Sequence, residues 1–448
     1  MNIIEKVQPA LCARKIAVIG SGYVGLTLSA SLALLGHEVE CTDKSIERVE
    51  QLACGDVPIV EEGLTEVVEH MLAAGRLRFS VDNKLAAGNA EFVFLCLPTP
   101  TGADGWADLS FVRQVSEEIG SHLRPGTVVI TKSTVPVGTS EMVRGALGRD
   151  DVHVVSNPEF LAEGTALQDC LRPDRIVIGA ASEAIAQSVA DLYGPFAYAR
   201  SIFTDVASAE MIKYASNAYL AVRLTYVNSI AEMCEMAGAD IRSVMRGMGA
   251  DRRIGTAFLQ PGPGWGGSCF PKDTEALVQT AGQLGCDLSL VETAIAINAQ
   301  HVGRVVQKVV GLLDGEVTGK RIALWGLTFK AGTDDRRRSP ALEIACRLTD
   351  LGAEVHAYDP TVPAGTLLEI EAHSSSFSAC EDADALVIGT EWSEFATIDL
   401  SVLATVMKGL VIMDARNLLN PISAVKAGFR YSGIGIPTAG LREAVVAV

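Results

Sequence analysis

The stretch over residues 15–43 constrains the fold of this chain more than any other. It contains an apolar strand over 15–19, glycines in the spacing GxGxxG, a helix of small residues that runs to Leu35, and a second strand over 37–42 that ends at an acid. Strand, tight turn, helix and strand in this order are typical of a βαβ unit that binds a dinucleotide, and the closing acid makes the motif specific. We therefore expect an α/β fold with a doubly wound parallel sheet.

Each glycine of the motif has a physical role. Gly20 permits the tight turn, Gly22 lets a pyrophosphate approach the backbone, and Gly25 allows the helix to pack closely on the strand. The phosphates then face the N-terminus of the helix. Asp43 is expected to accept hydrogen bonds from the ribose hydroxyls and to repel a 2′-phosphate. This favours NAD over NADP, a preference that Lys44 beside it weakens a little.

Further apolar strands are expected over 92–97 and 127–132, alternating with helical stretches in the same sheet. Polar turns follow both strands, and ligands of such sheets bind beyond the carboxyl ends of the strands. Thr99 and Thr134 in these turns are therefore candidates for lining the nicotinamide site. A role as ordinary turn threonines explains their positions equally well.

Length, charge and cysteine usage exclude several classes of protein. A chain of 448 residues predicts two or three domains, and its formal charge of −17 makes it a poor nucleic-acid binder, although a local basic pocket still suits an anionic ligand. No apolar run reaches membrane-spanning length, and the first residues lack a secretory signal. The ten cysteines are scattered without CxxC pairs. We therefore expect reduced thiols in a cytoplasmic protein, with no disulfide frame and no metal site.

A glycine-rich loop over 262–273, GPGWGGSCFPKD, is the clearest candidate for chemistry. It places Cys269 behind the glycines and Asp273 four residues later, with Ser268 as an N-cap and Pro271 in the first turn of a helix. A thiol at the positive end of a helix dipole has a lowered pKa and becomes a nucleophile. The alternative is a buried structural cysteine in a tight loop, the usual state of a lone cysteine. The context favours chemistry.

Two pairs of polar residues at i,i+4 spacing are weaker candidates. Glu159 and Glu163 are expected on one face of a short helix after an Asn-Pro pair, directly beyond a strand of the sheet. Lys213 and Asn217 share a face of a nearly continuous helix over 207–236, which is long enough to bridge two domains and to offer a dimer face. Solvated helix surface is the ordinary explanation of each pair.

A second sheet domain is expected from about residue 318, because KRIALWG and LGAEVHAYD echo the N-terminal unit. Its glycine fingerprint is replaced by GLTFKAGTDD, so a second dinucleotide should not bind there in the same manner. Lys330 and the arginines at 336–338 are suited to a different diphosphate. A solvated charged face remains the competing explanation for Arg336 and Arg338.

An NAD domain and an activated cysteine together suggest oxidation of an aldehyde. A thiolate adds to the aldehyde, the thiohemiacetal gives up a hydride, and the thioester is hydrolysed to an acid. A base such as Lys213 or Asp273 acting on an alcohol would allow one site to carry an alcohol to a carboxylate with two NAD molecules.

Several longer motifs carry a resemblance. They are GSGYVG, a PTP turn with DGWADLS, STVPVGT, NPEFLAEG with LRPDRIVIG, KYASNAYLA, GADRRIG, GPGWGGSCFPKD, FK with TDDRRRSP, and DARN. Over essentially the whole chain after the leader, these motifs resemble the UDP-glucose/GDP-mannose dehydrogenase family. The resemblance implies two Rossmann-like domains joined by a long central helix. It implies a leader (1–13), an NAD-binding domain (14–203), a central helical and dimerisation region with the cysteine loop (204–300) and a UDP-sugar-binding domain (301–448).

The resemblance also implies oxidation of UDP-glucose to UDP-glucuronate with two NAD reduced, and a role for each matching residue. Cys269 would be the nucleophile, and Lys213 and Asp273, beside Asn217, would handle the alcohol proton and stabilise an oxyanion. Glu159 would assist thioester hydrolysis. Thr134 and Glu163 would support the cofactor and an active-site water. The implied cofactor contacts are Gly20, Gly22, Tyr23, Val24, Gly25, Asp43, Lys44, Arg48, Thr99, Thr134, Glu163 and Arg337. The implied substrate contacts are Glu159, Phe160, Leu161, Lys213, Asn217, Arg253, Phe258, Leu259, Gly266, Phe329, Lys330 and Arg416, with Arg253 reaching a neighbouring subunit.

Three positions depart from the pattern of the family. Ala162 stands where a basic or polar residue is more usual, Trp265 replaces phenylalanine or tyrosine, and Arg338 often corresponds to an acid. Arg338 would alter the anion environment of the UDP pocket, so another nucleotide sugar, GDP-mannose or a UDP-N-acetylhexosamine, is the alternative substrate. A protein that senses NAD without catalysis is the alternative of a different class. The family further implies a homodimer or higher oligomer that contacts no nucleic acid or membrane.

Overall fold

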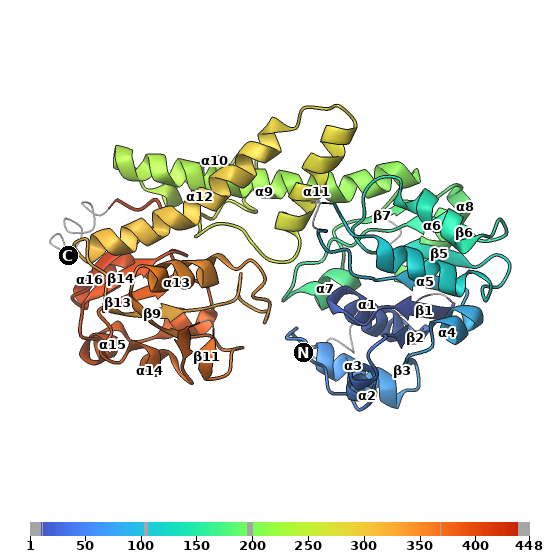
Figure 1. The fold of residues 1–448 in the computed structure, drawn as a ribbon, viewed down its shortest axis with the longest axis horizontal. Coiled ribbons are helices and arrows are strands. Elements are labelled where there is room, and N and C mark those ends of the chain that lie inside the picture. The colour runs from blue at the N-terminus through green and yellow to red at the C-terminus, as the bar shows by residue number, and fades with distance from the viewer. Residues whose placement is uncertain (1–9, 11, 103–105, 195–199, 368, 438–448) are drawn as a thin grey trace. The chain divides into compact units, whose positions relative to one another are not determined.

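The computed structural model describes residues 10, 12–102, 106–194, 200–367 and 369–437. The contacts of the chain divide it into two compact units, Met1–Ser216 with Glu275–Gln283 and Asn217–Thr274 with Leu284–Val448. Each unit is built on its own sheet (Figure 1). The division at residues 13, 203 and 300 that we expect from the sequence stays a prediction.

The sheet of the first unit has the strand order β3-β2-β1-β4-β5-β6-β7-β8. Its strands are β1 (Lys15–Ile19), β2 (Glu38–Thr42), β3 (Leu77–Ser80), β4 (Phe92–Leu95), β5 (Val128–Thr131), β6 (His153–Ser156), β7 (Ile176–Gly179) and β8 (Ser201–Thr204). Neighbouring strands are parallel except β6 and β7. The order 3-2-1-4-5-6 is that of a dinucleotide-binding sheet, which confirms the predicted fold class.

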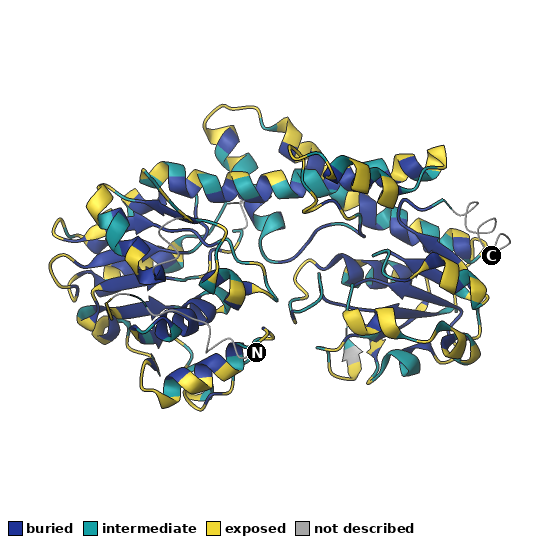
Figure 2. Ribbon diagram, turned by 180° about the vertical axis from the view of Figure 1, so that it is seen from behind, coloured by how far each residue is buried: buried dark blue, intermediate teal, exposed yellow. Residues whose placement is uncertain are grey.

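Helices cover both faces of this sheet because its strands are apolar on both sides. Along β1, Ile16 and Val18 belong to one buried cluster, whereas Ala17 and Ile19 belong to another. The helices are α1 (Tyr23–Leu34), α2 (Ile46–Ala53), α3 (Leu64–Ala73), α4 (Asn83–Asn89), α5 (Ser110–Gly120), α6 (Thr139–Leu147), α7 (Ala166–Leu171) and α8 (Glu183–Ala190). Figure 2 shows the buried strands and the exposed outer sides of these helices.

The sheet of the second unit has the order β11-β12-β10-β9-β13-β14-β15. Its strands are β9 (Arg321–Trp325), β10 (Glu354–Tyr358), β11 (Gly365–Leu367), β12 (Ile370–Ala372), β13 (Ala385–Ile388), β14 (Val411–Asp414) and β15 (Arg430–Gly433). All pairs are parallel except β11 with β12, so the predicted second Rossmann-like sheet is confirmed. The helices of this unit are α10 (Ile241–Gly249), α12 (Ser289–Leu312), α13 (Pro340–Asp350), α14 (Ser376–Cys380), α15 (Leu400–Val406) and α16 (Pro421–Lys426).

Two helices contribute residues to both units. The central helix α9 (Val206–Ala237) has 32 residues, close to the predicted span, and α11 (Phe270–Gln283) follows the glycine-rich loop. Within the described part of the chain, no helix is both long and apolar enough to cross a membrane.

Candidate functional site

In the glycine loop between β1 and α1, some glycines are required by the packing of the chain and another leaves space for a ligand. A Cβ on Gly20 would lie 2.3 Å from the carbonyl oxygen of Cys96, and one on Gly25 would lie 1.8 Å from the carbonyl oxygen of Gly20. A Cβ on Gly22 would meet no atom within 4 Å. The chain therefore needs glycine at the first and third positions for its own packing. At the second position the space is open, which is the cradle that a pyrophosphate requires.

Asp43 follows β2 and anchors this loop. Its carboxylate accepts hydrogen bonds from the amide of Ser21 at 3.0 Å, from the hydroxyl of Ser21 at 2.7 Å and from the amide of Ser45. Burial alone would raise the pKa of Asp43, but these hydrogen bonds and the charge of Arg48 outweigh burial and lower the pKa. Arg48 itself donates to the carbonyl oxygen of Ser21. Lys44 lies over the ring of Phe111. The acid therefore stays ionised beside the expected ribose position.

Glu61 is a residue of this region that the sequence did not reveal. Its carboxylate accepts hydrogen bonds from the hydroxyl of Tyr23 and from the amides of Gly164 and Leu167. Gly164 also donates to the Tyr23 hydroxyl at 2.7 Å. This network ties Tyr23, the first residue of α1, to the segment that carries Glu163. Val24 follows Tyr23 in the same helix. Nothing in the spacing of the sequence marks Glu61, because its partners lie 38, 103 and 106 residues away.

Thr99 and Thr134 lie together beyond the carboxyl ends of β4 and β5, as predicted. The hydroxyl of Thr99 donates to the carbonyl oxygen of Thr134 at 2.9 Å, and both residues are buried. Ser133 fixes the same turn by donating to the carbonyl oxygen of Leu97 at 2.7 Å. The two threonines therefore occupy the edge of the sheet where a ligand binds.

Glu159 and Lys213 form a buried ion pair with 2.9 Å between Oε1 and Nζ. Burial alone would raise the pKa of Glu159, but the charge and hydrogen bond of Lys213 outweigh burial and lower the pKa. The short helix expected over Glu159 and Glu163 is wrong, because both residues lie in a loop and α7 begins only at Ala166. Gly164 adopts a φ of 84°, which interrupts a right-handed helix at this point.

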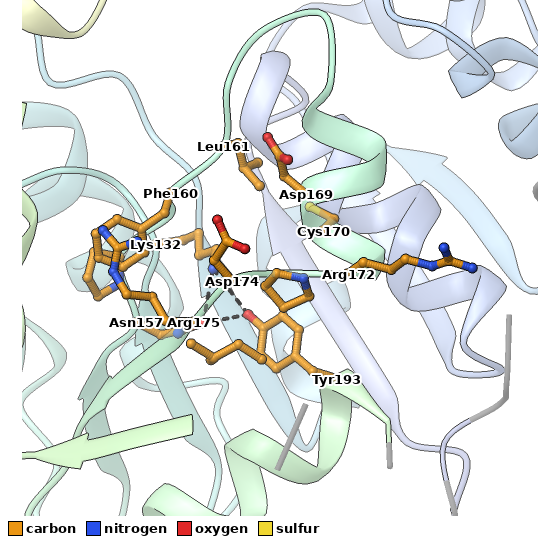
Figure 3. Close-up of a pocket in the computed structure, with 13 residues that line it drawn as sticks. Lys132, Asn157, Phe160, Leu161, Asp169, Cys170, Arg172, Asp174, Arg175 and Tyr193 are labelled. Atoms are coloured by element: carbon orange, nitrogen blue, oxygen red, sulfur yellow. Dashed lines mark hydrogen bonds between the residues drawn. The ribbon is translucent and has the colours of Figure 1, made fainter. Parts of the chain in front are cut away.

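The segment on either side of Glu159 borders a cavity of about 100 Å³ whose wall includes Phe160 and Leu161. Lys132, Asn157 and Tyr193 are joined by hydrogen bonds along it (Figure 3). The amide of Asn157 also donates to the carbonyl oxygen of Val177 at 2.8 Å. The ammonium of Lys132 is buried, and the neutral oxygens of Asn157 and Tyr193 accept its hydrogen bonds. Lys132 therefore holds the ends of the strands next to the segment that is predicted to bind the substrate.

The cysteine loop leads into α11 one residue later than predicted. The helix begins at Phe270, so Cys269 and not Ser268 directly precedes it, and the amide of Asp273 donates to the carbonyl oxygen of Cys269 at 2.9 Å. The carboxylate of Asp273 is fully buried. It accepts from the amide of Asn217 at 2.6 Å and forms an ion pair with Lys272 at 2.6 Å. Lys272 is not among the predicted site residues, although it adjoins Asp273.

Polar side chains from α9 and α12 hold the approach to this loop. Asn298 donates to the carbonyl oxygen of Trp265 and accepts from its amide, both at 2.9 Å. Asn228 accepts from the amide of Gly262 at 3.0 Å, and His301 contacts the carbonyl oxygen of Gly262 at 2.8 Å. Each of these three positioning residues lies 33 to 39 residues along the chain from its partner in the loop. Asn228 precedes its partner by 34 residues, and the other two follow theirs. Spacing in the sequence could not identify them.

The glycines at 266 and 267 serve the packing of the chain itself. A Cβ on Gly266 would lie 2.0 Å from the carbonyl oxygen of Arg338, and one on Gly267 would lie 2.9 Å from the ring of Phe329. The group that lies against these two glycines is therefore a segment of the same unit. Arg416 donates to the carbonyl oxygen of Phe329 at 2.7 Å, and Lys330 lies over the Phe329 ring. This brings four of the predicted substrate residues together: Gly266, Phe329, Lys330 and Arg416.

Two of the other predicted residues contact the cysteine loop or its helix: the ring of Phe258 lies 6.3 Å from that of Phe270, and the carbonyl oxygen of Arg337 accepts from the amide of Gly267 at 3.1 Å. Arg253 is highly exposed and forms an ion pair with Asp251 at 2.6 Å. Arg337 forms a similar pair with Asp335 at 2.7 Å. Phe258 is exposed with a φ of 56°, whereas the side chain of Leu259 is buried in the core of the second unit. A contact of Leu259 with a ligand therefore requires its backbone.

The surroundings of three other cysteines make their thiols unreactive. Cys41, Cys170 and Cys380 are buried, and burial raises the pKa of each thiol to about 12. They remain protonated at neutral pH, which is typical of structural cysteines. None of the ten cysteines, all of which lie in the described residues, forms a disulfide.

Models of one protein family match most of the chain. The NAD binding domain of the UDP-glucose/GDP-mannose dehydrogenase family matches residues 14–197, the central domain matches 207–300, and the UDP binding domain matches 323–421. The chain belongs to the UDP-glucose/GDP-mannose dehydrogenase family. The resemblance inferred from the motifs is thereby confirmed, and the chain has the NAD-binding domain of this family.

Individual members of the UDP-glucose/GDP-mannose dehydrogenase family are similar in sequence to this chain over nearly its whole length. A UDP-glucose 6-dehydrogenase of Rhizobium meliloti (strain 1021) is 45% identical over 94% of this chain and 100% of its own length. A UDP-glucose 6-dehydrogenase of Pseudomonas aeruginosa is 41% identical over 95% and 98%. Among solved structures, a UDP-glucose dehydrogenase from Pyrobaculum islandicum has a TM-score of 0.85 at 31% identity, covering 95% of this chain and 98% of that one. A UDP-D-ManNAc dehydrogenase from Pyrococcus horikoshii has a TM-score of 0.84 at 28% identity, covering 94% and 99%.

Substituting Gly22 with valine is expected to weaken NAD binding at least about 10-fold, because the side chain fills the space of the pyrophosphate. The melting temperature should barely change, since nothing lies within 4 Å of that Cβ. Gly25→Ala is the matched contrast, because its Cβ overlaps the carbonyl oxygen of Gly20 and should lower the melting temperature. Calorimetric titration with NAD and thermal unfolding measure the two effects. Unchanged NAD affinity in Gly22→Val would contradict the placement of the cofactor.

Proposed function

We propose that this chain oxidises UDP-glucose to UDP-glucuronate and reduces two NAD molecules per sugar. The observation that carries the proposal is Cys269 directly before α11, with Asp273 in the first turn of that helix held by Asn217 of α9. The UDP binding domain of the family and the relatives named UDP-glucose 6-dehydrogenase support the choice of substrate.

The first oxidation converts the 6-hydroxyl of the sugar to an aldehyde. NAD, when bound, accepts the hydride of each oxidation. We assign the hydroxyl proton to Lys213 or Asp273, and we assign the stabilisation of a developing oxyanion to Lys213 and Asn217. Lys213 and Asn217 are one turn apart on α9, which supports assigning both to the same step.

The second oxidation requires the thiol. The Cys269 sulfur adds to the aldehyde carbon to form a thiohemiacetal, and loss of a hydride from that carbon leaves a thioester. Water then adds to the thioester carbon, the carbon–sulfur bond breaks, and the carboxylate and the thiol are released. Glu159 accepts a proton from this water, and its lowered pKa keeps it in the basic form at neutral pH. Thr134 helps to position the water.

We assign the UDP-sugar to the residues that the family motifs mark. Phe329, Lys330 and Arg416 would contact it from the C-terminal domain, together with Gly266. Phe160 and Leu161 lie on the chain next to Glu159 and would contact the sugar. Arg253, which is exposed, is suited to reach the site of a neighbouring subunit. Phe258 and the backbone of Leu259 complete the set.

The stoichiometry of the reaction tests this proposal. With limiting UDP-glucose, we expect two NADH per sugar and UDP-glucuronate as the product. One NADH per sugar would mean that the aldehyde leaves and that Cys269 has no catalytic role. No NADH with UDP-glucose, but turnover of GDP-mannose or a UDP-N-acetylhexosamine, would assign the alternative substrate. NAD binding without turnover of any nucleotide sugar would indicate the non-catalytic alternative.

We also propose a cytoplasmic homodimer in which part of α9 lies at the interface. Tyr219, Tyr226 and Met233 follow one another at intervals of seven residues on one helix face, with exposed fractions of 62%, 51% and 65%. Such a stripe of large apolar side chains is typical of an interface. Replacing both tyrosines by glutamate should convert the dimer to monomers in sedimentation experiments. The control is Leu290→Glu, an exposed leucine outside α9 whose substitution should leave the dimer intact.

A further inference from the structure

Two neighbouring strands next to the β11 edge of the second sheet carry a group of side chains that the dehydrogenase chemistry does not use. His356 lies on β10, Glu371 lies on β12, and His373 follows β12 by one residue. The parallel register pairs His356 directly with Glu371. His373, one residue beyond the end of β12, joins them, because its Nε2 lies 2.9 Å from His356 Nδ1. The backbone of the sheet therefore brings two imidazoles and one carboxylate together.

The distances within this group match a coordination sphere. His356 Nδ1 lies 2.9 Å from His373 Nε2 and 3.3 Å from a carboxylate oxygen of Glu371, and His373 Nε2 lies 3.9 Å from the other oxygen. Ligands at about 2.0–2.1 Å from a tetrahedral zinc ion are separated by roughly 3.4 Å, close to the 3.3 Å between His356 Nδ1 and the nearer oxygen of Glu371. The two rings need to move apart by only several tenths of an ångström. His373 lies after the strand and not within it.

Neither protonation state of His356 Nδ1 suits all of its neighbours. Arg321 approaches the same nitrogen at 3.2 Å and can only donate to it. A lone pair on Nδ1 therefore accepts from Arg321 and His373 but faces the carboxylate of Glu371. A proton on Nδ1 suits Glu371 but conflicts with Arg321. A metal ion removes the first conflict, because the lone pairs of both imidazoles and of the carboxylate can all point to it.

We propose that His356, Glu371 and His373 bind a divalent transition-metal ion of the zinc type, with water as a fourth ligand. Two imidazoles and a carboxylate are a ligand set of zinc. The charge of Glu371 offsets part of that of the ion, and the guanidinium of Arg321 has to leave Nδ1 when the ion binds. The ion links β12 to β10 and so stabilises the pairing of these two strands, which lie next to the edge strand β11. None of these residues belongs to the predicted catalytic, cofactor or substrate contacts.

Titration of the full-length protein with Co²⁺ tests the proposal, because the absorption spectrum of cobalt distinguishes nitrogen and oxygen ligands from thiolates. We expect one equivalent to bind with a nitrogen–oxygen spectrum. His373→Ala and Glu371→Gln should each weaken this binding at least about 10-fold, as expected for the loss of a ligand. His153→Ala removes an exposed histidine of the first unit and is the matched control, with unchanged affinity. Because Glu371 is largely exposed, Glu371→Gln should remain folded.

Thermal unfolding with Zn²⁺ gives a second readout. Zinc at about 100 times its dissociation constant should raise the melting temperature of the wild type, because it binds only the folded protein. Both ligand variants should lose this shift, and His153→Ala should keep it. Three results would overturn the proposal: no cobalt binding at millimolar concentration, equal binding by His373→Ala and the wild type, or a thiolate spectrum in place of the expected one. None of these results bears on dehydrogenase activity, which is measured separately.

Discussion

Replacing Cys269 by serine is expected to lower the rate of UDP-glucuronate formation by at least about 10⁴-fold, as removal of an essential nucleophile does in other covalent mechanisms. The serine hydroxyl is a far weaker nucleophile than a thiolate, so neither the hemiacetal nor the ester forms at a useful rate. The side chains have nearly the same size, and the residue is only half-buried, so NAD affinity and melting temperature should be preserved. Product formation is measured by chromatography and NAD binding by calorimetry.

Cys286→Ser is the matched control for this variant. Cys286 lies on an exposed turn of the chain after α11, and its thiol contacts only a backbone carbonyl in the described structure, at 3.8 Å. The control should produce UDP-glucuronate at the wild-type rate. If Cys269→Ser did so as well, the thioester mechanism would be wrong, whatever the stoichiometry of NADH.

Replacing Lys213 by methionine is expected to destabilise the first unit by about 3–5 kcal/mol, because it leaves the buried carboxylate of Glu159 without its cation. The pair is almost inaccessible to water, with exposed side-chain fractions of 4% and 6%. We also expect kcat to fall by about 10²–10⁴-fold, as for the loss of a group that transfers a proton. Urea unfolding and steady-state kinetics measure the two effects.

Two further variants separate burial from charge. Arg144→Met breaks an exposed ion pair with Glu141 and should change stability by less than about 1 kcal/mol. The double variant Lys213→Met with Glu159→Gln removes both charges and should recover much of the stability that Lys213→Met loses. An equal effect of Lys213→Met and Arg144→Met would show that the Glu159–Lys213 pair is not buried as described.

The same ion pair sets the direction of a pH effect. The pKa of Glu159 is lower in the folded protein than its unfolded value of about 4.3. The stability that the pair contributes is therefore fully present above about pH 4.3 and is lost as the pH falls through the folded-state pKa. In Lys213→Met, burial raises the pKa of Glu159 instead, so acid should stabilise this variant relative to the wild type.

The local parts of the fold could be predicted closely from the sequence. β1 has the predicted bounds, α9 differs from the prediction by one residue at each end, and Cys269 lies at the N-terminus of a helix. These features depend on residues near one another in the chain. Apolar periodicity predicts strands and helices, and glycine and proline restrict the backbone where they stand. The short helix expected over Glu159 and Glu163 failed because Gly164 takes a left-handed conformation that spacing alone does not reveal.

The sequence by itself determined the fold class and the cofactor loop and marked the candidate residues for the chemistry, because each is recorded in a contiguous motif. Only the tertiary structure decided which polar groups meet. Glu159 finds Lys213 54 residues later, Asn217 finds Asp273 56 residues later, and Glu61 binds Gly164 across 103 residues. His356 meets Glu371 only through the register of two neighbouring strands. Such pairs depend on strand order and helix packing, which bring distant segments together without leaving a periodic signal in the chain.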